Sequence, residues 1–570
     1  MARVNFRKKI FSISAVLVFF LIAGCSSENS PTNDIGSSAD AGFDSGTRPT
    51  TDMAADLNPV VDVNPVADVT PDPDTACTFV ICNGTCCADG QVCANNACCT
   101  PDCTGRVCGP DPTCGRSCGI CSGSDVCDNQ GQCVAGAGWA INGESSGLFA
   151  KGYDVAVDSN GDVFVTGGFE TPAIFGSTTL TSAGDVDIFV AKISSDGQVL
   201  WAISAGGTGL DDAQGIAVDA SGNAFIAARV AVTGSFGSFS VTSTGNVAPV
   251  VAKVSSSGQF LWAEAASDTL WAIGTGIAVD ASGNAYMVGE YRDEASFGGH
   301  QLVTYGIWDV FVTKISPSGQ FLWATGAGSP SSGDKGSDIA VDANGNSYIT
   351  GTFSADMDFG TTRLTHTGTG SMMCDMYVAK LDPTGRFLWA ESFDGPTWNL
   401  ISKGIAANAN GDTYVTGSFR NTAIFGSTTL SATGTGSEVF VAKLESAAGQ
   451  VVWATSGGSA GADIGEAIEV DGNGNAYVVG SFENTADFGN AHIVSQGSAD
   501  VFVAKVSHAG QFAWATAGGG VGSEYGYGLG HDVNGNTFVT GRFVGTSTFG
   551  STTLTSSGTG SIFVWGLHTP

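Results

Sequence analysis

The chain has 570 residues, too many for one ordinary hydrophobic core and enough for several domains. It holds 82 glycines, 42% hydrophobic residues and only 13% charged residues, a composition that suits many short strands joined by glycine turns. The formal net charge of −32 gives a surface that repels phosphates, so nucleic acid is excluded as a partner. The same surface can attract divalent cations or basic partners.

Residues 1–24 have the pattern of an export signal. Four basic residues stand within the first nine positions, and residues 10–23 form an almost uninterrupted apolar run, shorter than the about 20 residues that cross a bilayer. Residues 21–25 read Leu-Ile-Ala-Gly-Cys, which resembles the lipobox of bacterial lipoproteins. The resemblance implies that the thiol of Cys25 receives the lipid (palmitate) and anchors the chain to a membrane. Because Ser26 and not Asp follows, it also implies an outer-membrane lipoprotein, facing the cell surface or the periplasm. The alternative is an ordinary signal peptide with an incidental cysteine.

Residues 25–76 are predicted to be a disordered tether. They are rich in Ser, Pro, Asp, Thr and Ala, and Phe43 is their one aromatic residue, so they cannot bury enough surface to fold. A flexible chain of about 50 residues spans roughly 40 Å on average. The tether would therefore hold the following domain clear of the membrane.

Residues 77–134 are predicted to be a small disulfide-rich spacer. Fourteen of the sixteen cysteines fall in this segment, an even number in a stretch with few large apolar residues. Behind an export signal the default expectation is seven disulfides, with the connectivity left open. Zinc is the rival interpretation, but the segment contains no histidine. The cysteines are Cys77, Cys82, Cys86, Cys87, Cys93, Cys98, Cys99, Cys103, Cys108, Cys114, Cys118, Cys121, Cys127 and Cys133.

From residue 137 to residue 570 the chain repeats itself. A Trp-Ala pair recurs seven times at intervals of 61 to 66 residues, a period typical of propeller blades. The tryptophans, one per unit at a fixed phase, are predicted to pack between blades and not to form a carbohydrate platform. They are Trp139, Trp201, Trp262, Trp323, Trp389, Trp453 and Trp514.

Each unit is predicted to contain four strands. The first is apolar and ends in Asp, as in 215–219, and an Asn-Gly type turn leads to the second, as in 346–351. A connection with a Phe-Gly pair leads to the third strand, as in 187–192, and a glycine turn leads to the fourth, as in 320–324. Asn-Gly turns supply the positive φ that tight hairpins require.

The two ends of the repeat region complement each other. The last unit stops at its third strand, 563–566, and the region opens with an unmatched fourth strand at 138–142. Pairing of the two would close a ring and leave no exposed edge. The sequence therefore predicts an all-β fold: a closed seven-bladed β-propeller over 137–570, with a monomeric head.

These repeats resemble the bacterial β-propeller repeat (SBBP-type) family. The shared pattern is Ala-Val-Asp-x-x-Gly-Asn-x-Tyr-Val-x-Gly, then Asp-x-Phe-Val-x-Lys, then Gly and Trp. Local departures include Asn408 in place of the usual Asp and Pro249 in place of the Asp before the third strand. The resemblance implies the fold and brings no reaction with it.

Four carboxylates are the candidate binding residues. They stand eight residues before the Asp that ends a first strand, in the loop that enters the innermost strand, so we expect them at the mouth of the channel. There they could hold a cation or a basic ligand; solvated loop residues are the alternative. The corresponding positions of the other units are Ala150, Ala272 and Leu400. The four, here called the predicted rim, are Asp211, Asp334, Asp463 and Glu524.

The sequence indicates no cofactor, with calcium as the one candidate. The turn 158–162 superficially resembles a calcium loop, but hairpin capping explains the same residues. The six histidines occupy unrelated positions, and no Ser/His/Asp set appears. We therefore expect a non-enzymatic binding, adhesion or scaffold module with a protein or glycan ligand. The alternatives are a propeller enzyme, such as a polysaccharide lyase or hydrolase with its site at the channel mouth, and a purely structural envelope component. His, Tyr, Arg or Glu gathered at the mouth would favour the enzyme, and Gly, Ser and Thr would favour binding.

Overall fold

The computed structural model describes residues 138–567, apart from 171, 268, 331–332, 368–373 and 396–399. It also describes the backbone of six short strands of the cysteine-rich segment: β1 pairs antiparallel with β2, β3 pairs antiparallel with β4, and β5 pairs with β6. The predicted signal peptide, Cys25, the predicted tether and the cysteine side chains of the spacer lie outside the described residues. The six strands are β1 (Ile81–Cys82), β2 (Thr85–Cys86), β3 (Val92–Ala94), β4 (Ala97–Cys99), β5 (Asp125–Cys127) and β6 (Cys133–Ala135).

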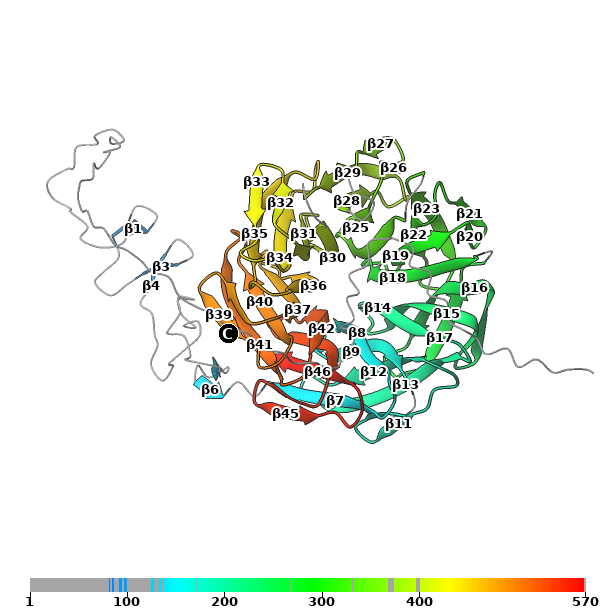
Figure 1. The fold of residues 1–570 in the computed structure, drawn as a ribbon, viewed down its shortest axis with the longest axis horizontal. Coiled ribbons are helices and arrows are strands. Elements are labelled where there is room, and N and C mark those ends of the chain that lie inside the picture. The colour runs from blue at the N-terminus through cyan, green and yellow to red at the C-terminus, as the bar shows by residue number, and fades with distance from the viewer. Residues whose placement is uncertain are drawn as a thin grey trace, which may run out of the picture. The chain divides into compact units, whose positions relative to one another are not determined.

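The described repeat region is all-β, with no helix, and its strands have a propeller arrangement (Figure 1). One antiparallel unit is β8 (Ala150–Val157), β9 (Val163–Phe169), β12 (Asp187–Ile193) and β13 (Val199–Gly207), paired in that order. The same order recurs along the chain. The further units are β14 (Asp212–Val218), β15 (Ala224–Phe236), β16 (Phe239–Val254) and β17 (Phe260–Ala265); β18 (Trp271–Val279), β19 (Ala285–Arg292), β22 (Asp309–Ile315) and β23 (Phe321–Ala327); β24 (Lys335–Val341), β25 (Ser347–Phe353), β28 (Asp375–Leu381) and β29 (Phe387–Phe393); β30 (Leu400–Ala407), β31 (Thr413–Phe419), β34 (Glu438–Leu444) and β35 (Val451–Gly457); β36 (Ile464–Val470), β37 (Ala476–Phe482), β40 (Asp500–Val506) and β41 (Phe512–Gly520); and β42 (Tyr525–His531), β43 (Thr537–Phe543), β46 (Ser561–Leu567) and β7 (Trp139–Ser145).

A short outer hairpin lies between the second and third strands of most units, where the sequence has its Phe-Gly pair. The phenylalanine of each pair is buried; Phe175 and Phe297, for example, are fully inaccessible to solvent. The hairpins are β10 (Ala173–Phe175) with β11 (Thr178–Leu180), β20 (Glu294–Phe297) with β21 (His300–Val303), β26 (Met357–Phe359) with β27 (Thr362–Leu364), β32 (Thr422–Phe425) with β33 (Thr428–Ser431), β38 (Thr485–Phe488) with β39 (Ala491–Val494), and β44 (Thr546–Phe549) with β45 (Thr552–Thr555).

The turn that follows each first strand is capped by its Asp. Asp158 Oδ1 accepts the backbone N–H groups of Asn160 at 2.9 Å and Asp162 at 3.0 Å. The Lys192 ammonium, from the third strand, lies 3.0 Å from the Asp158 carboxylate and 2.9 Å from that of Asp162. A lysine therefore occupies the place between the carboxylates, and the hairpin-capping interpretation of the turn 158–162 is confirmed.

The turn at Asn408 keeps the same hydrogen bonds without the usual Asp, and the negative charge is supplied by Asp412 instead. Asn408 Oδ1 accepts the N–H groups of Asn410 and Asp412, each at 3.0 Å, as the usual Asp would. The lysine of the third strand, Lys443, pairs with Asp412 at 2.9 Å. One carboxylate per turn is enough to hold the lysine.

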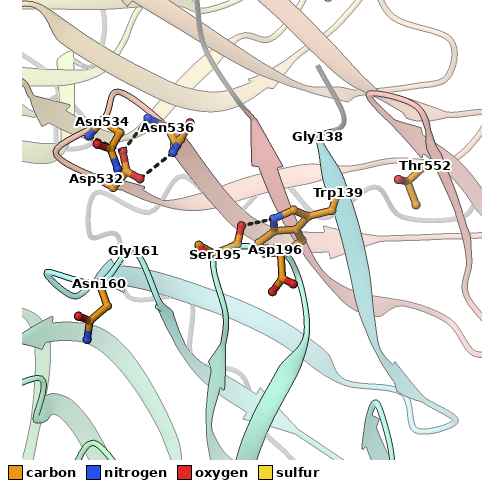
Figure 2. A pocket seen from close by; sticks show the side chains of 10 residues that line it. All are labelled: Gly138, Trp139, Asn160, Gly161, Ser195, Asp196, Asp532, Asn534, Asn536 and Thr552. Atoms are coloured by element: carbon orange, nitrogen blue, oxygen red, sulfur yellow. Dashed lines mark hydrogen bonds between the residues drawn. The ribbon is translucent and has the colours of Figure 1, made fainter. Parts of the chain in front are cut away.

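Six of the seven fourth-strand tryptophans dock onto a turn glycine of the next unit, whereas Trp514 Nε1 has no hydrogen-bond partner among the described residues. Trp139 Nε1 donates to the Ser195 carbonyl at 2.8 Å (Figure 2). A Cβ on Gly197, at φ +88°, would lie 2.7 Å from the Trp139 ring, so only glycine fits there. Trp389 repeats the contact, donating to the Ser446 carbonyl at 3.1 Å. The predicted packing of the tryptophans between units is confirmed for these six.

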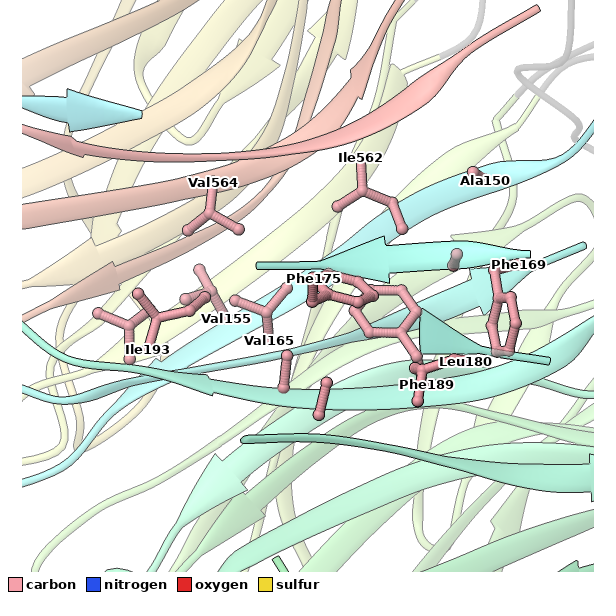
Figure 3. Packing of buried hydrophobic residues seen from close by; sticks show 14 of the residues in the cluster. Ala150, Val155, Val165, Phe169, Phe175, Leu180, Phe189, Ile193, Ile562 and Val564 are labelled. Carbon is pink, nitrogen blue, oxygen red and sulfur yellow. The ribbon is translucent and has the colours of Figure 1, made fainter. Parts of the chain in front are cut away.

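The first and last strands of the repeat region lie side by side. β7 pairs antiparallel with β46, with Trp139 opposite Gly566 and Asn142 opposite Phe563. The last unit then packs on the first: Ile562 and Val564 of β46 join Val155 and Val165 in one buried cluster (Figure 3). The residues that pair are those of the opening and closing segments of the sequence.

Removing a docked tryptophan should weaken the whole ring of contacts. Trp389 is only 9% exposed, so Trp389→Ala is expected to lower the free energy of unfolding by about 3–5 kcal/mol. Trp389→Phe keeps part of the packing and loses the hydrogen bond, and should cost less. Chemical denaturation of the full chain measures both; equal stability of Trp389→Ala and wild type would contradict the docking role.

Candidate functional site at the channel mouth

Every first strand carries a β-bulge at the same place. In β8 the register against β9 shifts between Gly152 and Asp154, so Tyr153 is the extra residue. A bulge re-aims one side chain and leaves its backbone out of the ladder. Each bulged residue is half-buried. The bulged residues are Tyr153, Gln214, Thr275, Ser337, Lys403, Glu466 and Tyr527.

The bulged residues surround the axis. Each first strand packs against the first strand of the next unit, and β42 packs against β8; Figure 1 shows these strands innermost. Whereas the capping Asp, the Trp and the turn glycines repeat along the chain, the bulged position changes from unit to unit. Repeated residues build the frame, so this variable and polar position is the best candidate for ligand contact. We call the seven bulged residues, together with the residue two positions before each of them, the channel mouth.

Tyrosines form one side of the mouth. The Tyr153 and Tyr527 rings lie 6.0 Å apart, and Tyr525 stacks on Tyr527 at 6.2 Å with the rings 8° from parallel. The Lys151 ammonium lies 5.8 Å from the ring centres of both Tyr153 and Tyr527, a cation–π arrangement.

A charge pair continues this side. Arg229 binds Asp212 through two hydrogen bonds, Nε to Oδ1 at 2.7 Å and Nη2 to Oδ2 at 2.8 Å, and Asp212 is fully buried. Burial, with the Asp212 carboxylate second, raises the pKa of Tyr153 above its usual range. Burial also raises the pKa of Glu290, while the charges of Lys335 and Arg229 oppose that rise.

The other side of the mouth is polar. Lys403 and Glu466 form an ion pair at 3.2 Å. Thr275 Oγ1 donates to the Gly336 carbonyl at 2.8 Å, and Ser337 Oγ donates to the Ser402 carbonyl at 3.1 Å. These bonds join each unit to the next, so the mouth is held rigidly as well as being polar.

Below the mouth, carboxyl groups join the inner strands. Asp154 Oδ2 accepts the N–H of Ile216 at 2.8 Å, and Asp338 Oδ2 accepts that of Ile405 at 3.0 Å. Burial raises the pKa of Asp338 to about 7. Burial, followed by the charge of Asp338, raises that of Glu469 to about 7.

The predicted rim residues are not exposed at the mouth. Asp211, Asp334, Asp463 and Glu524 are all fully buried and accept backbone N–H groups, so they are not solvated loop residues. Asp211 accepts the N–H groups of Gly207 at 2.6 Å and Ala231 at 2.7 Å. Its carboxylate therefore links two neighbouring units. The corresponding residues of the other units are buried as well: Ala150, Ala272 and Leu400.

Sequence reasoning selected the right loop and the wrong residue. Four of the mouth residues directly follow predicted-rim residues, and successive side chains of a strand point to opposite faces; the four are Asp212, Lys335, Ile464 and Tyr525. The bulged position lies five residues before the capping Asp, and its variability among the repeats was visible in the sequence. The β-bulge that directs this side chain inward could not be recognised in the sequence.

A groove of about 560 Å³ lies beside the turns that cap the first strands (Figure 2). Its polar groups already serve the fold: Asp532 accepts the N–H groups of Asn534 at 2.9 Å and Asn536 at 2.8 Å, and Trp139 bonds Ser195. No group of three or more His, Cys, Asp or Glu in the described residues is arranged to hold a metal ion. Among the same residues, no helix has the length and apolar character needed to cross a bilayer.

Comparison with known proteins agrees with the fold. A family model described as Beta-propeller repeat (SBBP) matches residues 322–352. An uncharacterized WD repeat-containing protein of Acanthamoeba polyphaga mimivirus is 25% identical over 255 residues, which cover 38% of this chain and 18% of that relative's length.

Solved structures share only the general architecture. A virginiamycin B lyase from Staphylococcus aureus, a catalytically inactive form with quinupristin, is 9% identical, covers 76% of this chain and 100% of its own, and has a TM-score of 0.38. A europium-containing methanol dehydrogenase is 11% identical, with coverages of 75% and 92% and a TM-score of 0.34. The repeated strand order and the matched repeat identify the chain as a β-propeller repeat protein.

Proposed function

We propose that the chain is a binding module that holds a glycan at the channel mouth. The observation that carries the proposal is the ring of bulged residues, which differ from unit to unit while the frame around them repeats. A site built on strands, with each side chain held by its neighbours, is preorganised for a ligand.

The chemistry of the mouth fits a sugar. Tyr525, Tyr527 and Tyr153 offer ring faces with polar ends, on which the C–H face of a pyranose can stack. Arg229 with Asp212 and Lys403 with Glu466 offer donors and acceptors whose charges are already balanced, which suits hydroxyl groups better than a free ion.

We further propose that the head is a seven-bladed propeller closed by β7. The register of β7 with β46 and the contact between β42 and β8 support this. The proposed anchor is a lipid on Cys25 that holds the head at the outer membrane through the tether. Its support is the sequence pattern of residues 1–25.

A propeller enzyme is the second candidate, because the mouth gathers Tyr, Arg and Glu, the residue types expected of that alternative. The described charges favour binding. Arg229 and Lys403 are held in ion pairs, and burial raises the pKa of Tyr153, which keeps its phenol protonated near neutral pH. To act as the base of a lyase, a tyrosine would need a lowered pKa.

A glycan screen on the full chain tests the binding site. Tyr527→Ala should weaken the Kd of any glycan that binds by about 2 kcal/mol, roughly thirtyfold. The matched control is Tyr305→Ala, since Tyr305 is 68% exposed on the β21–β22 connection. The proposal fails if no glycan binds, or if both variants bind as wild type does. Product formation from a bound glycan would support the enzyme instead.

Closure is tested by Ile141→Pro, which removes an N–H from β7, the strand that lies against Val564 of β46. If β7 closes the ring, freeing β46 exposes an edge and should lead to self-association and faster proteolysis. Ile141→Ala keeps the backbone and serves as the control. Size-exclusion chromatography with light scattering gives the readout, and a monomeric, protease-resistant Ile141→Pro chain would refute the closure.

A further inference from the structure

At four joins between units, a backbone hydrogen bond places two acidic residues next to each other. The first acid starts a third strand, and the second stands just before the next unit's first strand. The backbone fixes them as neighbours: Asp211 N–H donates to the Val186 carbonyl at 2.8 Å, and Glu524 N–H donates to that of Ala499 at 2.8 Å. The pairs are Asp187 with Asp211, Asp309 with Asp334, Glu438 with Asp463, and Asp500 with Glu524.

A glycine makes room for each pair. A Cβ on Gly206 would lie 2.8 Å from Asp187 Oδ1 and 3.1 Å from Asp211 Oδ2, so both carboxyl groups close on the same side of that glycine. The other pairs have Gly328, Gly458 and Gly519 at the same place, whereas the units without a pair have Glu144, Ser267 and Asp394. The glycine and the pair occur together.

One carboxyl oxygen in three of the pairs has no hydrogen-bond partner. Asp187 Oδ2 accepts the N–H of Ala183 at 2.8 Å, and both oxygens of Asp211 accept N–H groups, but Asp187 Oδ1 has none. Oδ1 of Asp309 and Oδ1 of Asp500 are in the same position. All three side chains are at least nine-tenths buried. An unbonded buried carboxylate oxygen is costly, so something must bind there.

Among the described residues, none of the ion pairs found includes Asp187, Asp211, Asp309, Glu438, Asp463, Asp500 or Glu524. The charged or titratable neighbours of Asp211 are Asp187 and Asp212, the latter already bound to Arg229. Those of Asp309 are Tyr291 and Tyr305. Asp463 faces Glu438, and Glu524 faces Asp500. Two buried carboxylates with no counter-charge cannot both ionise cheaply.

We propose that the three pairs with an unbonded oxygen are proton-binding sites, in which one proton bridges that oxygen of the strand acid and the carboxylate of the loop acid. A shared proton supplies the missing bond and removes one charge. A Ca²⁺ ion takes about six to eight oxygen ligands, whereas here most of the oxygens already accept N–H groups. Burial raises the pKa values of Asp211, Asp309 and Asp463 to about 6.

The remaining units act as internal controls. Where Leu400 replaces the loop acid, the strand acid Asp375 lies 3.0 Å from His366 Nδ1 instead. Where the strand acid is absent, at Pro249 and Ser561, the loop position is also apolar. A strand acid therefore never stands without a proton-bearing partner.

The proposal fixes the direction of a pH effect. A carboxyl group with a raised folded-state pKa contributes stability that is complete below its unfolded-state pKa near 4 and is lost as the pH rises through about 6. The joins between units should therefore be tighter in mildly acidic solution than at alkaline pH.

Asparagine replaces the shared proton permanently, because its carbonyl accepts the loop N–H and its amide donates to the loop acid. In Asp187→Asn, Asp309→Asn and Asp500→Asn, made singly and together in the full chain, we expect the fall in Tm between about pH 5 and about pH 8 to shrink with each substitution. The control is Asp185→Asn, an exposed residue of the loop before Asp187.

Equal losses of Tm at both pH values in the single variants would overturn the proposal. So would a saturable rise in the wild-type Tm with Ca²⁺ that the variants lack, because the pairs would then be cation sites. The single variants keep the test open if the combined one does not fold. Neither outcome bears on glycan binding, which is read from Tyr527.

Discussion

The contact on which the propeller arrangement depends is the docking of six fourth-strand tryptophans, each onto a turn glycine of the next unit. An isolated four-stranded sheet exposes two apolar faces and cannot be stable by itself. The indole covers the glycine and donates its N–H to a carbonyl in the same turn, as Trp389 does with Gly449 and Ser446. Packing and orientation are thus fixed by one side chain, and the distance between units is set by the absence of a Cβ on the glycine.

The frame could be predicted because its determinants are local and repeated. The capping Asp, the Asn-Gly turn and the lysine of the third strand each act within one unit, so the sequence pattern reports them directly. Even the replacement of the usual aspartate by Asn408 is local, since Asp412 supplies the charge four residues later. The pairing of β7 with β46 also follows from counting strands at the two ends.

The side chains at the mouth could not be predicted in the same way. Strand alternation without a bulge assigns inward and outward positions with a period of two, and one extra residue reverses the assignment for everything beyond it. The bulge at Gln214 lies between the loop acid Asp211 and the rest of β14. Sequence position alone therefore placed Asp211 at the solvent face, whereas its two accepted hydrogen bonds hold it within the join.

The innermost strand has to link neighbouring units and also to present variable side chains at the mouth, and the bulge assigns these two roles to different residues. A bulged residue makes no ladder pair, so its identity can change from Tyr to Ser or Lys without disturbing the sheet. The neighbouring loop acid has the opposite character, because its carboxyl binds the amides that join two units. Glu524 and Tyr525 are adjacent in the chain, as are Asp211 and Asp212. A change at the loop acid therefore acts on the join between units, whereas a change at the neighbouring mouth residue leaves that join in place.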